Sequence, residues 1–92
     1  MDITEVKVQL MPGSEKLKAF VSIKIGEELV IKDLKVIKGN NGYSVAMPSK
    51  KLKDGSHRDI IHPATNVARR KMEERVLSEY MKIATGDTEH SL

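Results

Sequence analysis

The feature that most constrains this chain is a strict alternation of side chains over residues 17–25. Apolar residues occupy every second position of this stretch, namely Leu17, Ala19, Val21, Ile23 and Ile25. The positions between them hold Lys18, Phe20, Ser22 and Lys24. Because successive side chains of an extended chain point to opposite faces, this period of two predicts a strand with one buried face. A single strand cannot bury that face, so other segments of the chain must pair with it.

Three further segments have the composition of strands, and turn-forming residues separate them. The segments are residues 3–10, 29–37 and 43–47. Between the four strands lie the turn signals Met11–Ser14, Gly26–Glu28 and Gly39–Gly42, rich in Pro, Gly and Asn. Short connections between consecutive strands favour an antiparallel meander. The alternation in the third segment breaks near Asp33, where we expect a bulge or a bend.

The pattern changes in the last part of the chain. Residues 48–58 are polar and are predicted to form a loop around an Asp-Gly turn, and residues 59–61 suffice only for a short strand. Beyond them, apolar residues recur every four positions, at Ala68, Met72, Val76, Tyr80 and Ala84. This spacing predicts an amphipathic helix of about five turns over residues 64–84.

Pro63 and Gly86 mark the two ends of this helix, since Pro is favoured near helix starts and Gly just beyond helix ends. The predicted fold class is therefore α+β: an antiparallel β-meander of four to five strands with one C-terminal amphipathic helix. We expect a single domain over residues 1–84. Residues 85–92 form a polar tail that is expected to fray.

The composition predicts a thin aliphatic core that needs a partner. Only three aromatic residues occur, Phe20, Tyr43 and Tyr80, in a chain of 92 residues. One helix covers a four-stranded sheet incompletely, and exposed sheet edges invite pairing with another chain. We therefore expect a homodimer that forms through β-structure.

Other features of the composition bear on location. There is no cysteine, which fits a reducing compartment. No apolar run approaches the roughly 18 residues that a membrane span needs, and the N-terminal MDITEVKV lacks the pattern of a signal peptide. We expect a cytoplasmic protein without a membrane partner.

The net charge of +3 is concentrated in one stretch of the sequence. Residues 50–71 contain seven Lys and Arg but two Asp, whereas the stretches on either side are nearly balanced or acidic. Such a cluster attracts phosphate groups. The candidate nucleic-acid-binding residues in it are Lys50, Lys51, Lys53, Arg58, Arg69, Arg70 and Lys71. The alternative is that Glu73, Glu74 and Glu79 neutralise the basic residues along the helix.

Other kinds of site find little support in the sequence. The three histidines, His57, His62 and His90, do not have the spacing of a zinc site, and His62 is expected to make a structural hydrogen bond at the turn before Pro63. No nucleophile elbow or phosphate-binding loop motif occurs. We expect no enzymatic activity, no cofactor and no metal. The scarcity of aromatic residues argues against a platform on which single-stranded bases stack.

From Val36 to Pro63 the chain reads VIKGNNGYSVAMPSKKLKDGSHRDIIHP, and this segment resembles the stage V sporulation protein G family, also called septation regulators. The opening MDITEVKV and the helical VLSEYMK are similar to that family as well, so the resemblance covers about residues 1–84. It implies a bacterial cytoplasmic homodimer that binds DNA, and in some members RNA. It also implies a role in sporulation, septum formation or gene regulation.

The basic positions that match the family pattern are Lys50, Lys51 and Arg58. The helix start from Asn66 to Lys71 is more individual, so target preference is expected to be set there, with Asn66 among the contacting residues. His57 stands where the family usually has an aromatic residue. The competing hypothesis is a protein-interaction module that regulates cell division without binding nucleic acid.

Overall fold

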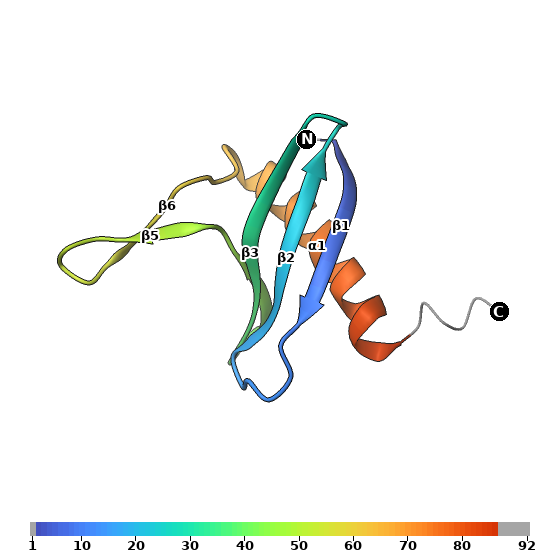
Figure 1. Cartoon of the computed structure of the whole chain (residues 1–92), viewed down its shortest axis with the longest axis horizontal. Helices are drawn as coiled ribbons and strands as arrows, with labels where there is room; N and C mark the ends of the chain where they lie inside the picture. The colour runs from blue at the N-terminus through green and yellow to red at the C-terminus, as the bar shows by residue number, and fades with distance from the viewer. Residues whose placement is uncertain (1, 87–92) are drawn as a thin grey trace.

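The computed structural model of the protein describes residues 2–86 and contains two antiparallel sheets and one helix (Figure 1). The elements are β1 (Ile3–Leu10), β2 (Leu17–Ile25), β3 (Leu29–Gly39), β4 (Gly42–Ala46), β5 (Ser49–Lys51), β6 (His57–Asp59) and α1 (Asn66–Thr85). The first four strands pair in sequence order as a meander, and β5 pairs with β6 in a separate hairpin. The predicted α+β class and C-terminal helix are confirmed.

The bulge predicted in the third strand is present at Asp33. This residue has a φ of 68°, and the pairing register between β2 and β3 shifts here: Val21 lies opposite Leu34, but Ile23 lies opposite Ile31. Asp tolerates this left-handed conformation better than branched side chains do. The extra residue keeps Ile31 and Leu34, three positions apart, against the same core.

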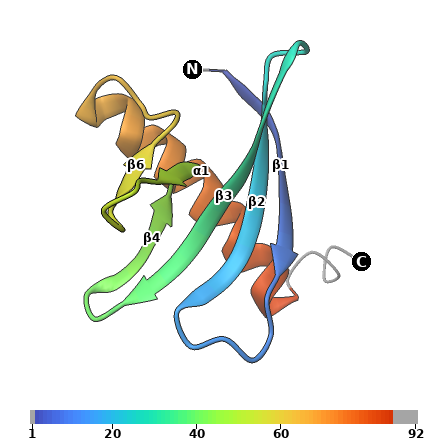
Figure 2. The ribbon, with the colours of Figure 1, turned by 60° about the vertical axis from the view of Figure 1, so that its left-hand side comes forward.

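Helix α1 lies across one face of the four-stranded sheet and contacts β1 and β4 (Figures 1 and 2). The residues that it buries are Met72, Val76 and Tyr80, the predicted stripe at four-residue spacing. They meet the inward side chains of the sheet, namely Val6, Ala19, Val21, Ile23, Leu34, Val36 and Val45. Each strand thus gives its core-facing alternate residues to one aliphatic core.

The two tyrosines close one part of this core. The ring centroids of Tyr43 on β4 and Tyr80 on α1 lie 5.6 Å apart in a tilted arrangement. Burial raises the pKa of the Tyr80 hydroxyl, and neighbouring Tyr43 raises it further. Tyr80 therefore stays neutral and joins α1 to the sheet as a packing residue.

The ends of α1 follow the expected capping chemistry. Thr65 is the N-cap residue, and its hydroxyl oxygen accepts a hydrogen bond of 3.0 Å from the Ala68 amide. Gly86 adopts the left-handed conformation, with φ 75°, that commonly ends helices. The helix starts two residues later than predicted and includes Thr85, the first residue of the expected tail. Residues 87–92 of that tail lie outside the described residues.

The prediction of a polar loop over residues 48–58 is wrong in one respect, because this stretch contains most of the β5–β6 hairpin. All six strand residues of the hairpin are exposed, so no apolar alternation marks them in the sequence. The short strand expected at 59–61 is displaced: β6 ends at Asp59, and Ile60 and Ile61 follow it. Within residues 2–86, no helix is long and apolar enough to cross a membrane.

The core can be tested with two methionines of the same helix. Met72 is 1% exposed, whereas Met81 is 39% exposed. We expect Met72→Ala to lower the free energy of unfolding by about 2–5 kcal/mol, because the truncation leaves a cavity between α1 and the sheet. Met81→Ala should change it by less than about 0.5 kcal/mol. Urea unfolding followed by circular dichroism measures both, and equal effects would contradict this placement of the core.

Candidate nucleic-acid interface

The β5–β6 hairpin projects from the body of the protein (Figures 1 and 2). All of its strand residues are exposed, and they include the basic Lys50, Lys51 and Arg58. Lys50 lies directly opposite Arg58, and Lys51 lies opposite His57. At the base of the hairpin the Ile60 amide donates a 2.8 Å hydrogen bond to the Pro48 carbonyl. The strands of this hairpin are therefore held together by backbone hydrogen bonds, because their side chains are all exposed and bury no core of their own.

The pairing of Lys50 with Arg58 is electrostatically unfavourable. Like charges directly opposite on two strands destabilise an antiparallel pair. Neither residue forms an ion pair within the described part of the chain, and the hairpin's own carboxylates, Asp54 and Asp59, form none either. An anion bound between the two cations would relieve their repulsion.

The turn of the hairpin is fixed by Asp54. Its carboxylate accepts hydrogen bonds from the Ser56 hydroxyl at 2.6 Å and the Ser56 amide at 2.9 Å. These hydrogen bonds hold the pKa of Asp54 below its usual value. The carboxylate is therefore charged and engaged in the turn, and it is not directed to the basic strands. Lys53 occupies the same exposed turn.

The first two turns of α1 carry the second basic group. Asn66 is the first helical residue, and Arg69, Arg70 and Lys71 follow, whereas the first turn contains no acidic residue. Cations at this end oppose the helix dipole, which favours negative charge there. Arg69 pairs with Glu73 at 3.8 Å, while Arg70 and Lys71 are exposed and form no ion pair with any described residue.

The structure places the predicted residues in two groups at the same end of the molecule, the hairpin and the helix start (Figure 2). The chain from Ile60 to Thr65 joins them, and the two elements do not pack extensively on each other. Among the described residues, the expected neutralisation of the candidate basic residues by helix glutamates is limited to Arg69 with Glu73, since Glu79 pairs with Arg75 at 3.8 Å.

Sequence reasoning missed Arg75 as part of the basic surface. Arg75 and Lys71 line a hollow beside Asp2 and Ile3, at the start of β1. Their separation of four residues places them on one helix face, so the spacing alone could have linked them.

The histidines also have defined positions. His62 makes the expected turn contact, with its Nδ1 atom 3.0 Å from the Pro63 carbonyl oxygen. His57 is exposed on β6, opposite Lys51. Among residues 2–86, no three His, Asp or Glu side chains converge in the manner of a metal site.

Together these features define a small α+β protein with a projecting basic hairpin beside a basic helix start. The sequence model of the family described as SpoVG matches residues 1–82. A protein of Clostridium kluyveri named "Putative septation protein SpoVG" is 42% identical over 88 residues, which cover 96% of this chain and 92% of that protein. A protein of the same name from Anaeromyxobacter sp. (strain K) is 51% identical, covering 87% and 78% of the two chains. The chain belongs to the SpoVG family.

The repulsion within the hairpin can be tested by reversing one charge. Lys50→Glu places opposite charges across the hairpin, so the β5 and β6 amides should exchange with solvent roughly two- to five-fold more slowly. Lys51→Glu changes the charge equally but faces His57, and should slow exchange less. Hydrogen exchange followed by NMR measures both variants. Faster exchange in Lys50→Glu would show that Lys50 and Arg58 do not repel each other.

Proposed function

We propose that this protein is a cytoplasmic nucleic-acid-binding regulator that acts as a homodimer and binds phosphate groups with its basic hairpin and helix start. One observation carries this proposal: positive charge is placed unfavourably twice at the same end of the molecule. Lys50 faces Arg58 across the hairpin, and Arg70 and Lys71 lie near the positive end of a helix dipole. A bound polyanion favours both arrangements, and clustered violations of local rules are typical of functional sites.

The two groups suit different contacts with a nucleic acid. Lys50, Lys51 and Lys53 supply compact charges for phosphates, which position a protein on the duplex. Arg58 and Arg70 carry planar guanidinium groups, which bind phosphates or guanine edges through paired hydrogen bonds. The hairpin is a two-stranded ribbon, an element that the major groove of DNA can accommodate. RNA is the second expected target.

Exposed apolar residues support the homodimer. Ile60 is 65% exposed and Ile61 is 41% exposed, directly after the hairpin, and Val67 at the helix start is 52% exposed. In addition, β4 pairs only with the part of β3 from Lys35 to Gly39, which leaves the edge of residues 29–34 without a strand. A second copy that covers these groups would satisfy both the apolar side chains and the sheet edge.

The process that this regulator serves is proposed from its relatives. The curated proteins described above are named for septation, and the chain covers most of their length. We propose a role in septation or sporulation on this basis. The alternative, a protein-interaction module that regulates division without binding nucleic acid, is favoured by the same exposed Ile60 and Ile61.

The interface predicts a strong dependence of duplex binding on salt. Each phosphate contact contributes about −0.9 to the slope of log K against log salt concentration for B-DNA. Replacing Lys50 and Arg58 together by Gln should therefore make the slope less steep by about 2 and weaken binding at every salt concentration. Fluorescence anisotropy with a labelled duplex, from 50 to 300 mM salt, measures this change.

The matched control removes the same charge elsewhere. Lys16 lies in the turn before β2 and Lys82 in the last turn of α1, both exposed and away from the basic end. The Lys16→Gln, Lys82→Gln variant should keep nearly the wild-type slope. Equal losses in the two double variants would indicate an effect of net charge alone. Absence of binding by the wild type at low salt would instead favour the protein-interaction module.

The proposed dimer contact can be tested by a substitution at Ile60. Ile60→Asn should shift the protein from dimer to monomer at micromolar concentration, because a polar side chain enters the proposed contact. Met81→Asn changes an exposed apolar side chain on the far part of α1 and should leave the dimer intact. Sedimentation velocity distinguishes the two states. A wild-type monomer at all concentrations would contradict the proposed homodimer.

A further inference from the structure

A second basic surface lies on the face of the four-stranded sheet that is turned away from α1. We call it the outer sheet face. Its members alternate with the core residues of β1, β2 and β3, and they are Lys7, Gln9, Phe20, Ser22, Lys24, Lys32 and Lys35. None of these residues belongs to the basic hairpin or to the helix start.

Phe20 is the unusual member of the outer sheet face. Its neighbours along β2, Ala19 and Val21, are buried against the helix, so Phe20 points to the opposite side and stays partly exposed. The residues directly across from it are Gln9 on β1 and Lys35 on β3. Tyr43 and Tyr80, by contrast, pack against each other at the core. The only phenylalanine of the chain is thus set among polar side chains.

The bulge in β3 brings two lysines to the same side as Phe20. Lys32 and Lys35 are three residues apart, and in a regular strand an odd separation would place them on opposite faces. The extra residue at Asp33 compensates for this difference. Lys32 lines an open hollow together with Lys7 and Phe20, which shows that they share one surface.

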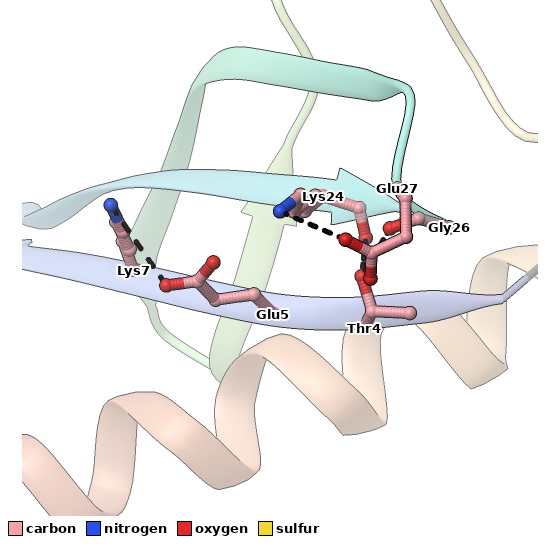
Figure 3. Close-up of polar contacts among 6 residues, drawn as sticks. All are labelled: Thr4, Glu5, Lys7, Lys24, Gly26 and Glu27. Carbon is pink, nitrogen blue, oxygen red and sulfur yellow. Dashed lines mark hydrogen bonds and ion pairs between the residues drawn. The ribbon is translucent and has the colours of Figure 1, made fainter.

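Lysines outnumber carboxylates on this surface, where Lys7, Lys24, Lys32 and Lys35 lie with Glu5, Glu27 and Asp33. Lys7 lies 3.9 Å from Glu5, and Lys24 lies 3.5 Å from Glu27, both on the side of the sheet away from the helix (Figure 3). Such exposed pairs are weak, so a stronger anion can displace the carboxylates. Lys32 and Lys35 have no ion-pair partner within residues 2–86.

We propose that the outer sheet face binds a single-stranded nucleic-acid segment, with one base stacked on Phe20 and its flanking phosphates on Lys7, Lys32 and Lys35. An aromatic ring on an open sheet face stacks with unpaired bases, because the faces of paired bases are covered within a duplex. Lysines on the neighbouring strands provide the charge that follows the sugar-phosphate backbone. One ring provides a site for one base and no extended platform.

The ring is what favours a nucleic acid over an acidic peptide at this surface. Lysines alone attract carboxylates and phosphates alike, but an acidic segment offers no flat group to stack on Phe20. The same distinction separates this surface from the hairpin, whose strands contain no Phe, Tyr or Trp.

The test measures the affinity of the whole chain for labelled 12-nucleotide oligo-dT and oligo-U, with a duplex for comparison. Phe20→Leu keeps an apolar side chain on the sheet but removes the aromatic face. We expect this variant to bind the single strands about 5- to 150-fold more weakly, with unchanged duplex binding. Phe20→Tyr keeps the ring and should retain affinity for the single strands. The Lys32→Gln, Lys35→Gln variant should make their salt dependence less steep.

A direct readout is available because the chain contains no tryptophan. Phe20→Trp introduces a single fluorophore, whose emission should be quenched on addition of oligo-dT if a base stacks on it. Unquenched emission with bound oligonucleotide, or equal affinity of Phe20→Leu and wild type, would overturn the proposal. If poly-glutamate displaces oligo-dT equally well from the wild type and from Phe20→Leu, the surface is a site for acidic partners. Because duplex binding by the hairpin is measured separately, either proposal can fail alone.

Discussion

The packing of α1 on one face of the meander is the interaction on which the rest of the structure depends. A four-stranded sheet with alternating side chains has one apolar face, and in this chain Met72, Val76 and Tyr80 cover it. No second helix and no disulfide shares this task within the described chain. The helix is therefore held by its buried stripe, and its remaining surface is available for charge. The basic start of α1 has a fixed position because the buried stripe further along the same helix is fixed.

Because a single helix covers the sheet in the described chain, two surfaces have no covering layer. The hairpin extends beyond the sheet with six exposed strand residues, and the outer sheet face has nothing packed against it within residues 2–86. Both surfaces concentrate lysine or arginine, so each is solvated well in the free protein and attractive to phosphate groups. They differ in chemistry, because the hairpin opposes Lys50 to Arg58 whereas the outer sheet face surrounds Phe20 with lysines. On the two proposals made above, a protein of 92 residues has separate surfaces for paired and for unpaired nucleic acid.

Much of the fold was predictable from local sequence signals. The strand over residues 17–25 has the predicted bounds, the break near Asp33 is a bulge, and the stripe from Met72 to Tyr80 is buried. The hairpin was missed because all of its strand side chains are exposed to water. Such strands need no alternation of apolar and polar residues, so the sequence shows none. Of the candidate site, the sequence located the basic residues except Arg75 and named Glu73 and Glu79 as possible partners. Side-chain geometry decided that Glu73 pairs with Arg69 and that Glu79 pairs with Arg75.

The sequence by itself determined the four strands of the meander and the helix, because hydrophobic period and turn residues act over a few neighbouring positions. It also determined that residues 50–71 are basic and that the chain carries one helix after a meander. Only the tertiary structure decided which charges share a surface. The register of β5 with β6 sets Lys50 against Arg58, and the bulge at Asp33 brings Lys32 to the side of Phe20 and Lys35. The turn and the backbone pairing fix the register of the hairpin, whereas the packing of the four-stranded sheet fixes the side of Lys32.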